Sequence, residues 1–122
     1  MTEQQLHKQI CDYLKWHPDK PMFNTDMSGI RLPMGLAKKA AALRSERGFP
    51  DIVVHEARFV FHGLFLEVKK ESPYKKDGTL KAGQHLKEQE EVIKKLLDRG
   101  YLAVFVWDFE ETKQLIDKYL AG

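Results

Sequence analysis

The chain contains a single cysteine, Cys11, among its 122 residues. An intramolecular disulfide and a cysteine-based zinc site are therefore excluded. The lack of a disulfide is typical of proteins of the reducing cytosol. No apolar run is long enough to cross a membrane, and the N-terminal residues MTEQQLHKQ do not resemble a secretory signal. The formal net charge of +2 is too small to identify a nucleic-acid partner by itself. We expect a cytoplasmic protein with no membrane partner.

The composition is that of an ordinary globular domain. Hydrophobic residues make up 43% of the chain and charged residues 31%, both close to the averages for soluble proteins. The sequence has no internal repeat, low-complexity tract or domain linker. A chain of 122 residues can bury one hydrophobic core without disulfides. The length predicts a single domain that spans residues 1–122.

Four segments have the composition or periodicity of helices. They are residues 2–16, residues 34–46 with Gly48 as the stop, residues 84–98 closed by Gly100, and a last helix that follows Asp108. Thr2 with Gln5 forms a predicted capping box at the first helix, and Asp108 with Glu111 caps the last. These boundaries leave room for strands between the helices.

Strand-like segments are rich in β-branched and aromatic residues. They are a short strand around residues 22–24, the segments 51–57 and 58–69, and the segment 101–107. The last of these is apolar throughout, so we expect it to be central in its sheet. The resulting order of helix, strands, helix, strand and helix predicts a mixed α/β domain.

The stretch GLFLEVKKE places an acid and a base inside an apolar strand. Because side chains alternate between the two faces of a strand, Phe65, Glu67 and Lys69 share one face. A buried charge is costly unless it is paired or binds a metal. Glu67 and Lys69 therefore form either a plain ion pair or part of a functional site.

Asp51 stands at the start of the preceding strand, directly after Pro50. An acid on one strand and an acid with a lysine on the next could converge at one edge of the sheet. Two carboxylates suit a hard cation such as Mg²⁺, which prefers oxygen ligands. Lys69 could then orient or activate the attacking water, or stabilise negative charge in a phosphoryl transition state.

The residue types of this pattern are not specific by themselves, because each half of the pattern occurs once more in the chain. Pro18 with Asp19 repeats the proline–acid pair, and Glu111 with Lys113 repeats the acid–lysine spacing. Neither example lies in an apolar strand, whereas the candidate residues do. The strand context is therefore what favours Asp51, Glu67 and Lys69.

Two polar residues interrupt the apolar faces of their own helices. Gln89 lies between Leu86 and Ile93 on the core face of the helix 84–98. Glu3 precedes Leu6 at the same helical spacing in the first helix. A polar side chain that points toward a core needs a polar partner there. Gln89 and Glu3 are therefore candidates for the same site as Asp51.

The sequence resembles the VRR-NUC domain of the PD-(D/E)XK nuclease superfamily. The residues that carry the resemblance are FPD, LFLEVK, DGTLKAGQHLKEQ and LLDRGYLAVFV, and it extends over roughly residues 1–120. It implies a restriction-endonuclease-like α/β core, a mixed sheet flanked by helices in the order αβββαβ, with an extra C-terminal helix. Phe49 departs from the family, which frequently has a small residue there.

The resemblance assigns roles to individual residues. Asp51 and Glu67 would be ligands of Mg²⁺ or Mn²⁺, Lys69 the catalytic lysine, and Gln89 the family's glutamine. The backbone carbonyl of Val68 and the carboxylate of Glu3 would be further metal ligands.

The resemblance also implies the substrate and the assembly. Standalone members of phages and bacteria resemble Holliday-junction resolvases and are commonly homodimers. We therefore expect a metal-dependent, structure-selective endonuclease that cleaves branched DNA, a Holliday junction or a flap, in the cytosol of a bacterium or a phage-infected cell.

Basic residues flank the proposed site and could contact DNA phosphates without reading base sequence. They are Lys38, Lys39, Arg44, Arg47, Lys70, Lys75, Lys76 and Lys81.

Each assignment has a simpler structural alternative. Asp51 could be a strand cap, Glu67 and Lys69 a solvent-facing ion pair on an edge strand, and Gln89 a buried side chain that bonds to backbone. Glu3 could merely favour the first turn of a helix. The histidines show no zinc-ligand spacing and are expected at the surface or as core filler; they are His7, His17, His55, His62 and His85.

The functional alternatives also stay open at the level of the sequence. The chain could be a DNA-binding module without catalysis, or an exonuclease or restriction-type nuclease of the same fold. A hydrolase of small phosphoesters would need a closed pocket, and no phosphate-cradling glycine loop is present.

Overall fold

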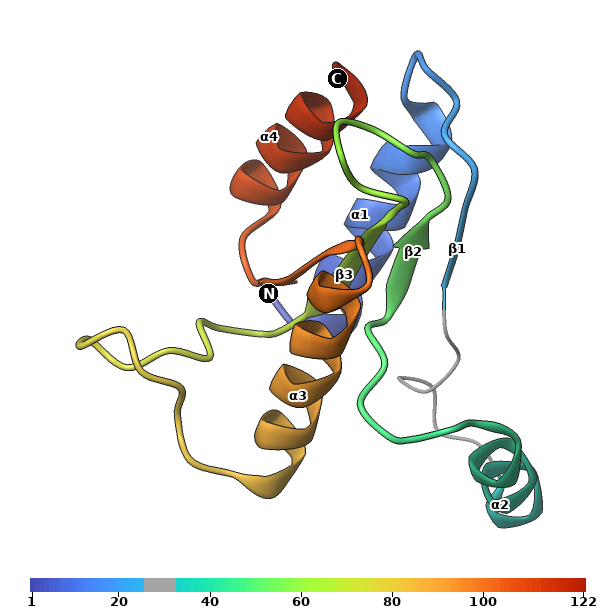
Figure 1. Cartoon of the computed structure of the whole chain (residues 1–122), viewed down its shortest axis with the longest axis vertical. Helices are drawn as coiled ribbons and strands as arrows, with labels where there is room; N and C mark the ends of the chain where they lie inside the picture. The colour runs from blue at the N-terminus through green and yellow to red at the C-terminus, as the bar shows by residue number, and fades with distance from the viewer. Residues whose placement is uncertain (26–32) are drawn as a thin grey trace.

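The computed structural model describes residues 1–25 and 33–122 (Figure 1). Its elements, in chain order, are α1 (Glu3–Trp16), β1 (Phe23–Thr25), α2 (Met34–Leu43), β2 (Ile52–Val54), β3 (Leu64–Val68), α3 (Gln84–Asp98), β4 (Leu102–Val106) and α4 (Phe109–Leu120). The predicted αβββαβ order with an extra C-terminal helix is present, and α2 is inserted between the first two strands.

The four strands form one mixed sheet in the order β1-β2-β3-β4. β1 and β2 are antiparallel, as are β2 and β3, whereas β3 and β4 are parallel. The parallel pair is joined through α3, which is the crossover that parallel strands require. β3 is thus paired on both sides, so its backbone is rigidly held.

Two apolar clusters cover the two faces of the sheet. On one face α1 and α4 pack on alternate strand residues, which include Leu66 and Val68. On the other face α3 packs on the remaining alternate residues, which include Phe65 and Phe105. Alternation along β3 therefore directs Glu67, between Leu66 and Val68, toward α3.

Three of the four predicted helices agree closely with the structure. The Thr2–Gln5 capping box is present at α1, and the Asp108 side chain accepts a hydrogen bond from the Glu111 backbone N–H at α4. The predicted helix 84–98 has the same bounds as α3. No helix in the two described ranges is long and apolar enough to span a membrane.

The predicted end of the second helix is wrong. α2 stops at Leu43, and the chain is irregular from Arg44 to Gly48. Helix propensity alone supported the longer prediction, and no residue of α2 is buried to extend it. Gly48 has the left-handed φ of 92° and instead lies against α3.

The two long strands predicted between residues 51 and 69 are much shorter than expected. The chain reverses at residues 58–61, where Arg58 and Phe61 exchange backbone hydrogen bonds of 3.1 and 2.9 Å. Phe59 adopts a φ of 55°, which is incompatible with an extended strand. The antiparallel pairing of β2 with β3 requires this reversal, so tertiary structure overrides the local β propensity.

The expectation of a central position for the segment 101–107 is also wrong. β4 pairs with β3 only and forms an edge of the sheet. Its residues are apolar because α3 covers one face and α4 approaches the other. Burial of both faces by helices produces the same continuous apolar pattern as a central position.

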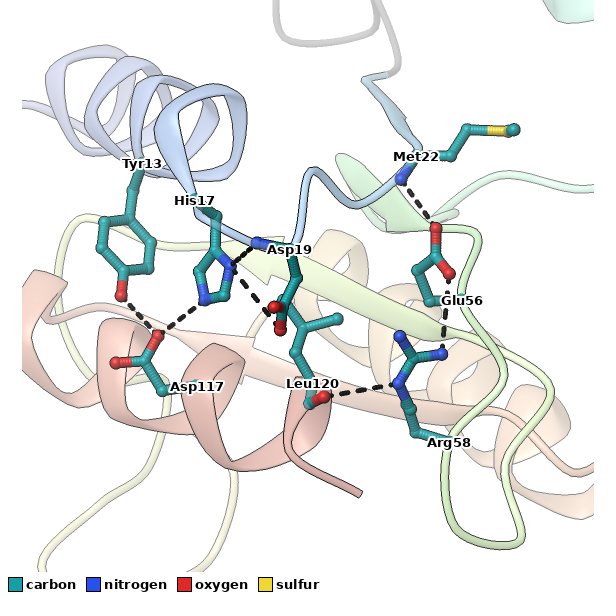
Figure 2. Close-up of polar contacts among 8 residues, drawn as sticks. All are labelled: Tyr13, His17, Asp19, Met22, Glu56, Arg58, Asp117 and Leu120. Atoms are coloured by element: carbon teal, nitrogen blue, oxygen red, sulfur yellow. Dashed lines mark hydrogen bonds and ion pairs between the residues drawn. The ribbon is translucent and has the colours of Figure 1, made fainter.

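A polar network joins α1 to α4 (Figure 2). The Tyr13 hydroxyl and the His17 Nε2 both contact Asp117 Oδ1, the latter at 3.1 Å. The Asp19 backbone N–H donates to His17 Nδ1 at 3.1 Å, so Nε2 carries the proton and donates to the carboxylate. One carboxylate on α4 therefore satisfies two donors from the end of α1.

Replacement of Asp117 by asparagine is expected to lower the free energy of unfolding by about 1–2 kcal/mol, because two donors lose their charged acceptor. Urea denaturation of Asp117→Asn, with Glu91→Gln at an exposed site of α3 as the control, measures this effect. Equal stability of both variants and the wild type would show that the network does not stabilise the fold.

Candidate active site

Asp51 and Glu67 meet across the β2–β3 pair. Ile52 is opposite Leu66 in this antiparallel register, so the next residues outward, Asp51 and Glu67, face each other. Asp51 is only 7% exposed, and its Oδ2 accepts a hydrogen bond of 2.9 Å from the Val68 backbone N–H. The strand that carries Glu67 therefore fixes the orientation of the Asp51 side chain. A residue that only caps the start of its own strand would not need this bond to a neighbouring strand.

Glu67 is buried near the end of the interior strand β3, with an exposed fraction of 2%. Its Oε1 accepts a hydrogen bond of 2.5 Å from Gln89 Nε2, and Lys69 Nζ lies 3.9 Å from the same oxygen. Its Oε2 is buried and has no hydrogen-bond partner. Gln89 thus bonds to one carboxylate oxygen, and the Lys69 ammonium lies near it. The other oxygen has no donor among the described side chains once both acids are ionised, because a hydrogen bond between the Glu67 and Asp51 carboxyl groups requires a proton on one of them.

Burial, and next the negative charge of Asp51, raise the pKa of Glu67 to about 9. Burial also raises the pKa of Asp51, while the Val68 N–H lowers it. Two adjacent buried carboxyl groups resist losing both protons, because each negative charge disfavours the other. At neutral pH and without a cation, the pair therefore holds a proton that a bound cation would replace.

Gln89 is the buried residue that joins α3 to Glu67. It is 5% exposed, and its Nε2 also lies 3.1 Å from His85 Nε2, one helical turn earlier. Its Oε1 is buried without a partner, like Glu67 Oε2. The glutamine bonds to side chains of the site rather than to backbone, which excludes the simpler structural interpretation.

Gly48 brings the segment before Asp51 against the first half of α3. A Cβ atom at Gly48 would lie 3.0 Å from the carbonyl carbon and oxygen of Glu88 and 3.1 Å from the Gln89 backbone nitrogen. Only glycine fits this approach without a shift of backbone, and its φ of 92° also favours glycine. Phe49, the departure from the family's pattern, is 36% exposed.

A second chain of polar contacts reaches Asp51 from α1. His7 Nε2 lies 2.5 Å from Thr25 Oγ1, and the Thr25 hydroxyl donates to the Asp51 carbonyl oxygen at 3.0 Å. The positive charge of His7 lowers the pKa of Asp51. This chain fixes the backbone where β2 begins.

Glu3 is exposed in the first turn of α1, about one turn before the buried Leu6. Figure 1 shows the N-terminus of the chain at the end of β3 from which the loop 69–83 departs. The negative charge of Glu3 is the weakest of the causes that raise the pKa of Glu67. The structure thus brings Glu3 to the edge of the site, and its role as a ligand stays a prediction.

The eight basic residues proposed to contact DNA are all exposed. Lys70 follows β3, and Lys75, Lys76 and Lys81 lie on the loop after it, which contains a turn closed by hydrogen bonds between Lys75 and Thr79 and between Gly78 and Lys75. The other four lie on α2 and the segment that follows it. In Figure 1 the loop 69–83 and α2 project on opposite sides of α3, with the site end of β3 between them.

The donor atoms of the site fit a hard divalent cation such as Mg²⁺ or Mn²⁺. The supporting observation is the unpartnered Glu67 Oε2, because a buried acceptor without a partner is unfavourable. No group of three or more His, Cys, Asp or Glu side chains within residues 1–25 and 33–122 is arranged to hold a metal. Mg²⁺ commonly uses one or two carboxylates with water and phosphate oxygens, so two suffice.

The structure excludes the simpler interpretation of Glu67 and Lys69. β3 is an interior strand, and the exposed fractions of the two side chains are 3% and 16%, so they are not a solvent-facing pair on an edge. Val68 contributes its backbone N–H to Asp51; metal binding by its carbonyl stays a prediction.

Sequence reasoning missed His7 and His85 as neighbours of the site. A usable signal existed, because His7 is four residues after Glu3 and His85 four residues before Gln89, so each lies on the same helical face. Thr25 had no such signal, since its contact depends on the pairing of β1 with β2.

The protein is a mixed α/β domain in which two buried acids and a lysine from the sheet region meet a glutamine of the covering helix α3. A solved structure described as "VRR_NUC domain protein" is similar to this chain, with a TM-score of 0.69 and 25% sequence identity over 99% of this chain and 89% of the other. No family model matches the chain, and no curated protein matches it.

The structural similarity supports the VRR-NUC family for this chain, and the mixed four-stranded sheet flanked by helices is consistent with the restriction-endonuclease-like fold of that family. The family suggests a nuclease and therefore binding to DNA.

Proposed function

We propose that this protein is a Mg²⁺- or Mn²⁺-dependent endonuclease that hydrolyses phosphodiester bonds in branched DNA. The observation that carries the proposal is the buried cluster of Asp51, Glu67, Lys69 and Gln89 at the end of an interior strand. Glu67 Oε2 has no hydrogen-bond donor in this cluster when both acids are ionised, and a lysine ammonium lies beside its other oxygen. A cation site next to a fixed ammonium group suits hydrolysis of a phosphate ester.

Asp51 and Glu67 would hold the cation, with Val68 and Glu3 as additional ligands. When bound, the cation would polarise the phosphate and favour deprotonation of water. Lys69 would activate or position the attacking water and stabilise the negative charge that develops on the phosphate oxygens. Gln89 fixes the orientation of the Glu67 carboxylate through its N–H group.

Replacement of Gln89 by leucine is expected to weaken the cation affinity by about 10- to 100-fold, because a hydrogen bond that orients a metal ligand is lost. Mn²⁺ titration of Gln89→Leu measures this, with Gln114→Leu on the exposed side of α4 as the matched control. An affinity equal to that of the wild type would remove Gln89 from the site.

The basic residues on α2 and on the loop 69–83 would hold DNA phosphates on the two sides of the site. Such contacts fix the position of a duplex and read no base sequence, which favours recognition of DNA structure. A homodimer would present two sites to two strands of a four-way junction or a flap. This part of the proposal rests on the resemblance to junction resolvases.

The test is cleavage of labelled linear duplex, single-stranded, flap and four-way junction DNA with Mg²⁺ or Mn²⁺, against EDTA. Cation-dependent cleavage that favours the branched forms supports the proposal in full. Equal cleavage of linear DNA would assign a nuclease of the same fold without structure selectivity. Binding without cleavage of any form would instead assign a non-catalytic DNA-binding module.

A further inference from the structure

α2 is the one helix among the described elements that contributes nothing to the core. None of its residues is buried, and Met34, Leu36 and Leu43 are 75%, 55% and 81% exposed. In Figure 1 it stands away from the sheet and from the other three helices. The helix is therefore not held in place by packing of its side chains.

A helix of ten residues is marginal in water when nothing packs on it. The N-terminus of α2 at Pro33 also lacks a side-chain hydrogen bond to its first N–H groups. Gly35 in the first turn weakens the helix further by about 1 kcal/mol. Contact with an external surface would therefore stabilise α2 as a helix.

The charges of α2 indicate what that surface is. Lys38 and Lys39 lie on one side of the helix, with the small residues Gly35 and Ala42 between them at 100° per residue. α2 contains no acidic residue, and Arg44 follows it directly. A positively charged side with small residues permits close approach of a phosphate backbone. The uncapped N–H groups of the first turn have the same electrostatic preference.

The segment that follows α2, residues 44–50, is attached to α3 beside the candidate active site. Glu46 Oε2 forms an ion pair of 2.7 Å with Lys95 Nζ of α3. Glu46 lies between Arg44 and Arg47 in the sequence, so this acid is paired with α3 and not with the arginines. Two residues later Gly48 lies against the backbone of Glu88 and Gln89. The segment that links α2 to Asp51 is thus attached to α3 at two points. DNA bound to α2 is consequently near the catalytic cluster.

We propose that α2, with Arg44 and Arg47, is an arm that binds the phosphate backbone of the DNA substrate outside the active site and becomes a stable helix only on DNA. This rests on the proposed nuclease function and names the element that provides affinity without taking part in chemistry. DNA, rather than a second copy of the chain, is the partner because the arm carries four cations and its single acid is paired to α3.

The first experiment measures DNA affinity by fluorescence anisotropy in EDTA, where cleavage does not occur. The double variant Lys38→Ala/Lys39→Ala is expected to bind about tenfold more weakly and to lower the salt dependence of binding by about two ions. The control is Lys15→Ala/Lys118→Ala, which removes the same charge from exposed positions of α1 and α4. The control variant should bind DNA with the affinity of the wild type.

A second variant, Ala40→Pro, breaks the helix and leaves every charge in place. Helical circular dichroism of the wild type is expected to increase when DNA is added, and Ala40→Pro is expected to abolish this increase and to weaken DNA binding. Unchanged folding of the core, measured by its thermal transition, makes the comparison valid because α2 buries nothing.

The outcomes separate this inference from the proposed function. Wild-type binding without cleavage, with affinity lost in the lysine variant, supports the arm and rejects the nuclease. Cleavage by the wild type, with the lysine variant binding like its control, overturns the arm alone. If Leu36→Ser/Leu43→Ser converts a dimer to a monomer while the lysine variant binds DNA normally, α2 contacts a second copy and the inference is wrong.

Discussion

Replacement of Lys69 by alanine is expected to slow DNA cleavage by about 10²–10⁴-fold, the usual effect of losing one group that transfers a proton or stabilises transition-state charge. The reason is its position: Lys69 Nζ lies 3.9 Å from Glu67 Oε1 and only 16% of the side chain is exposed. Lys69 directly follows β3, and its ammonium group is the cation that pairs with Glu67. Affinity for DNA should change much less than the rate.

The matched control for this prediction is Lys113→Ala. Lys113 has the same acid–lysine spacing from Glu111, but it lies on α4 and not in a strand. Single-turnover cleavage with enzyme in excess separates the chemical step from binding. A rate for Lys69→Ala within a factor of about three of the Lys113→Ala rate would remove the lysine from the reaction, since such a small ratio is under 1 kcal/mol of barrier.

Replacement of Glu67 by glutamine is expected to stabilise the cation-free protein while it abolishes cleavage. Burial raises the pKa of Glu67 from its ordinary value of 4.5 to about 9 in the folded state. Between these values the folded protein retains a proton that the unfolded chain has released. The free energy of unfolding of the wild type therefore falls as pH rises through this window.

Glutamine does not ionise, so Glu67→Gln should lack this decrease and exceed the wild type in stability by about 1–2 kcal/mol at pH 8 in EDTA. Urea denaturation at pH 5 and pH 8 measures the difference, and Glu71→Gln is the control at an exposed position. Cleavage by Glu67→Gln should be undetectable. A variant that is less stable than the wild type at pH 8 would contradict the carboxyl environment described for β3.

The buried cluster of Glu67, Lys69 and Gln89 could be predicted from sequence because two simple periodicities bring its members together. Alternation along a strand places Glu67 and Lys69 on one face, and helical spacing turns Gln89 toward the same sheet. An apolar context then distinguishes these residues from the decoys elsewhere in the chain. Both arguments use only the spacing of residues within one strand or one helix, and this spacing can be read directly from the sequence.

The features that sequence reasoning missed depend on contacts between distant segments. The turn at Phe59 and the edge position of β4 follow from which strands pair, and local propensity does not specify that. The early end of α2 has the same origin, since Gly48 must meet α3. The contact of His7 with Thr25 needs β1 in place beside β2.

The central claim is that Asp51 and Glu67 together bind a divalent cation. Isothermal titration calorimetry of Mn²⁺ binding to the wild type and to Asp51→Asn tests this claim without any DNA. Circular dichroism first shows that both proteins are folded. We predict saturable binding to the wild type and an affinity at least about 10-fold weaker for Asp51→Asn. Equal binding by the two proteins, or no binding to the wild type, would contradict the claim and leave Asp51 and Glu67 as structural groups.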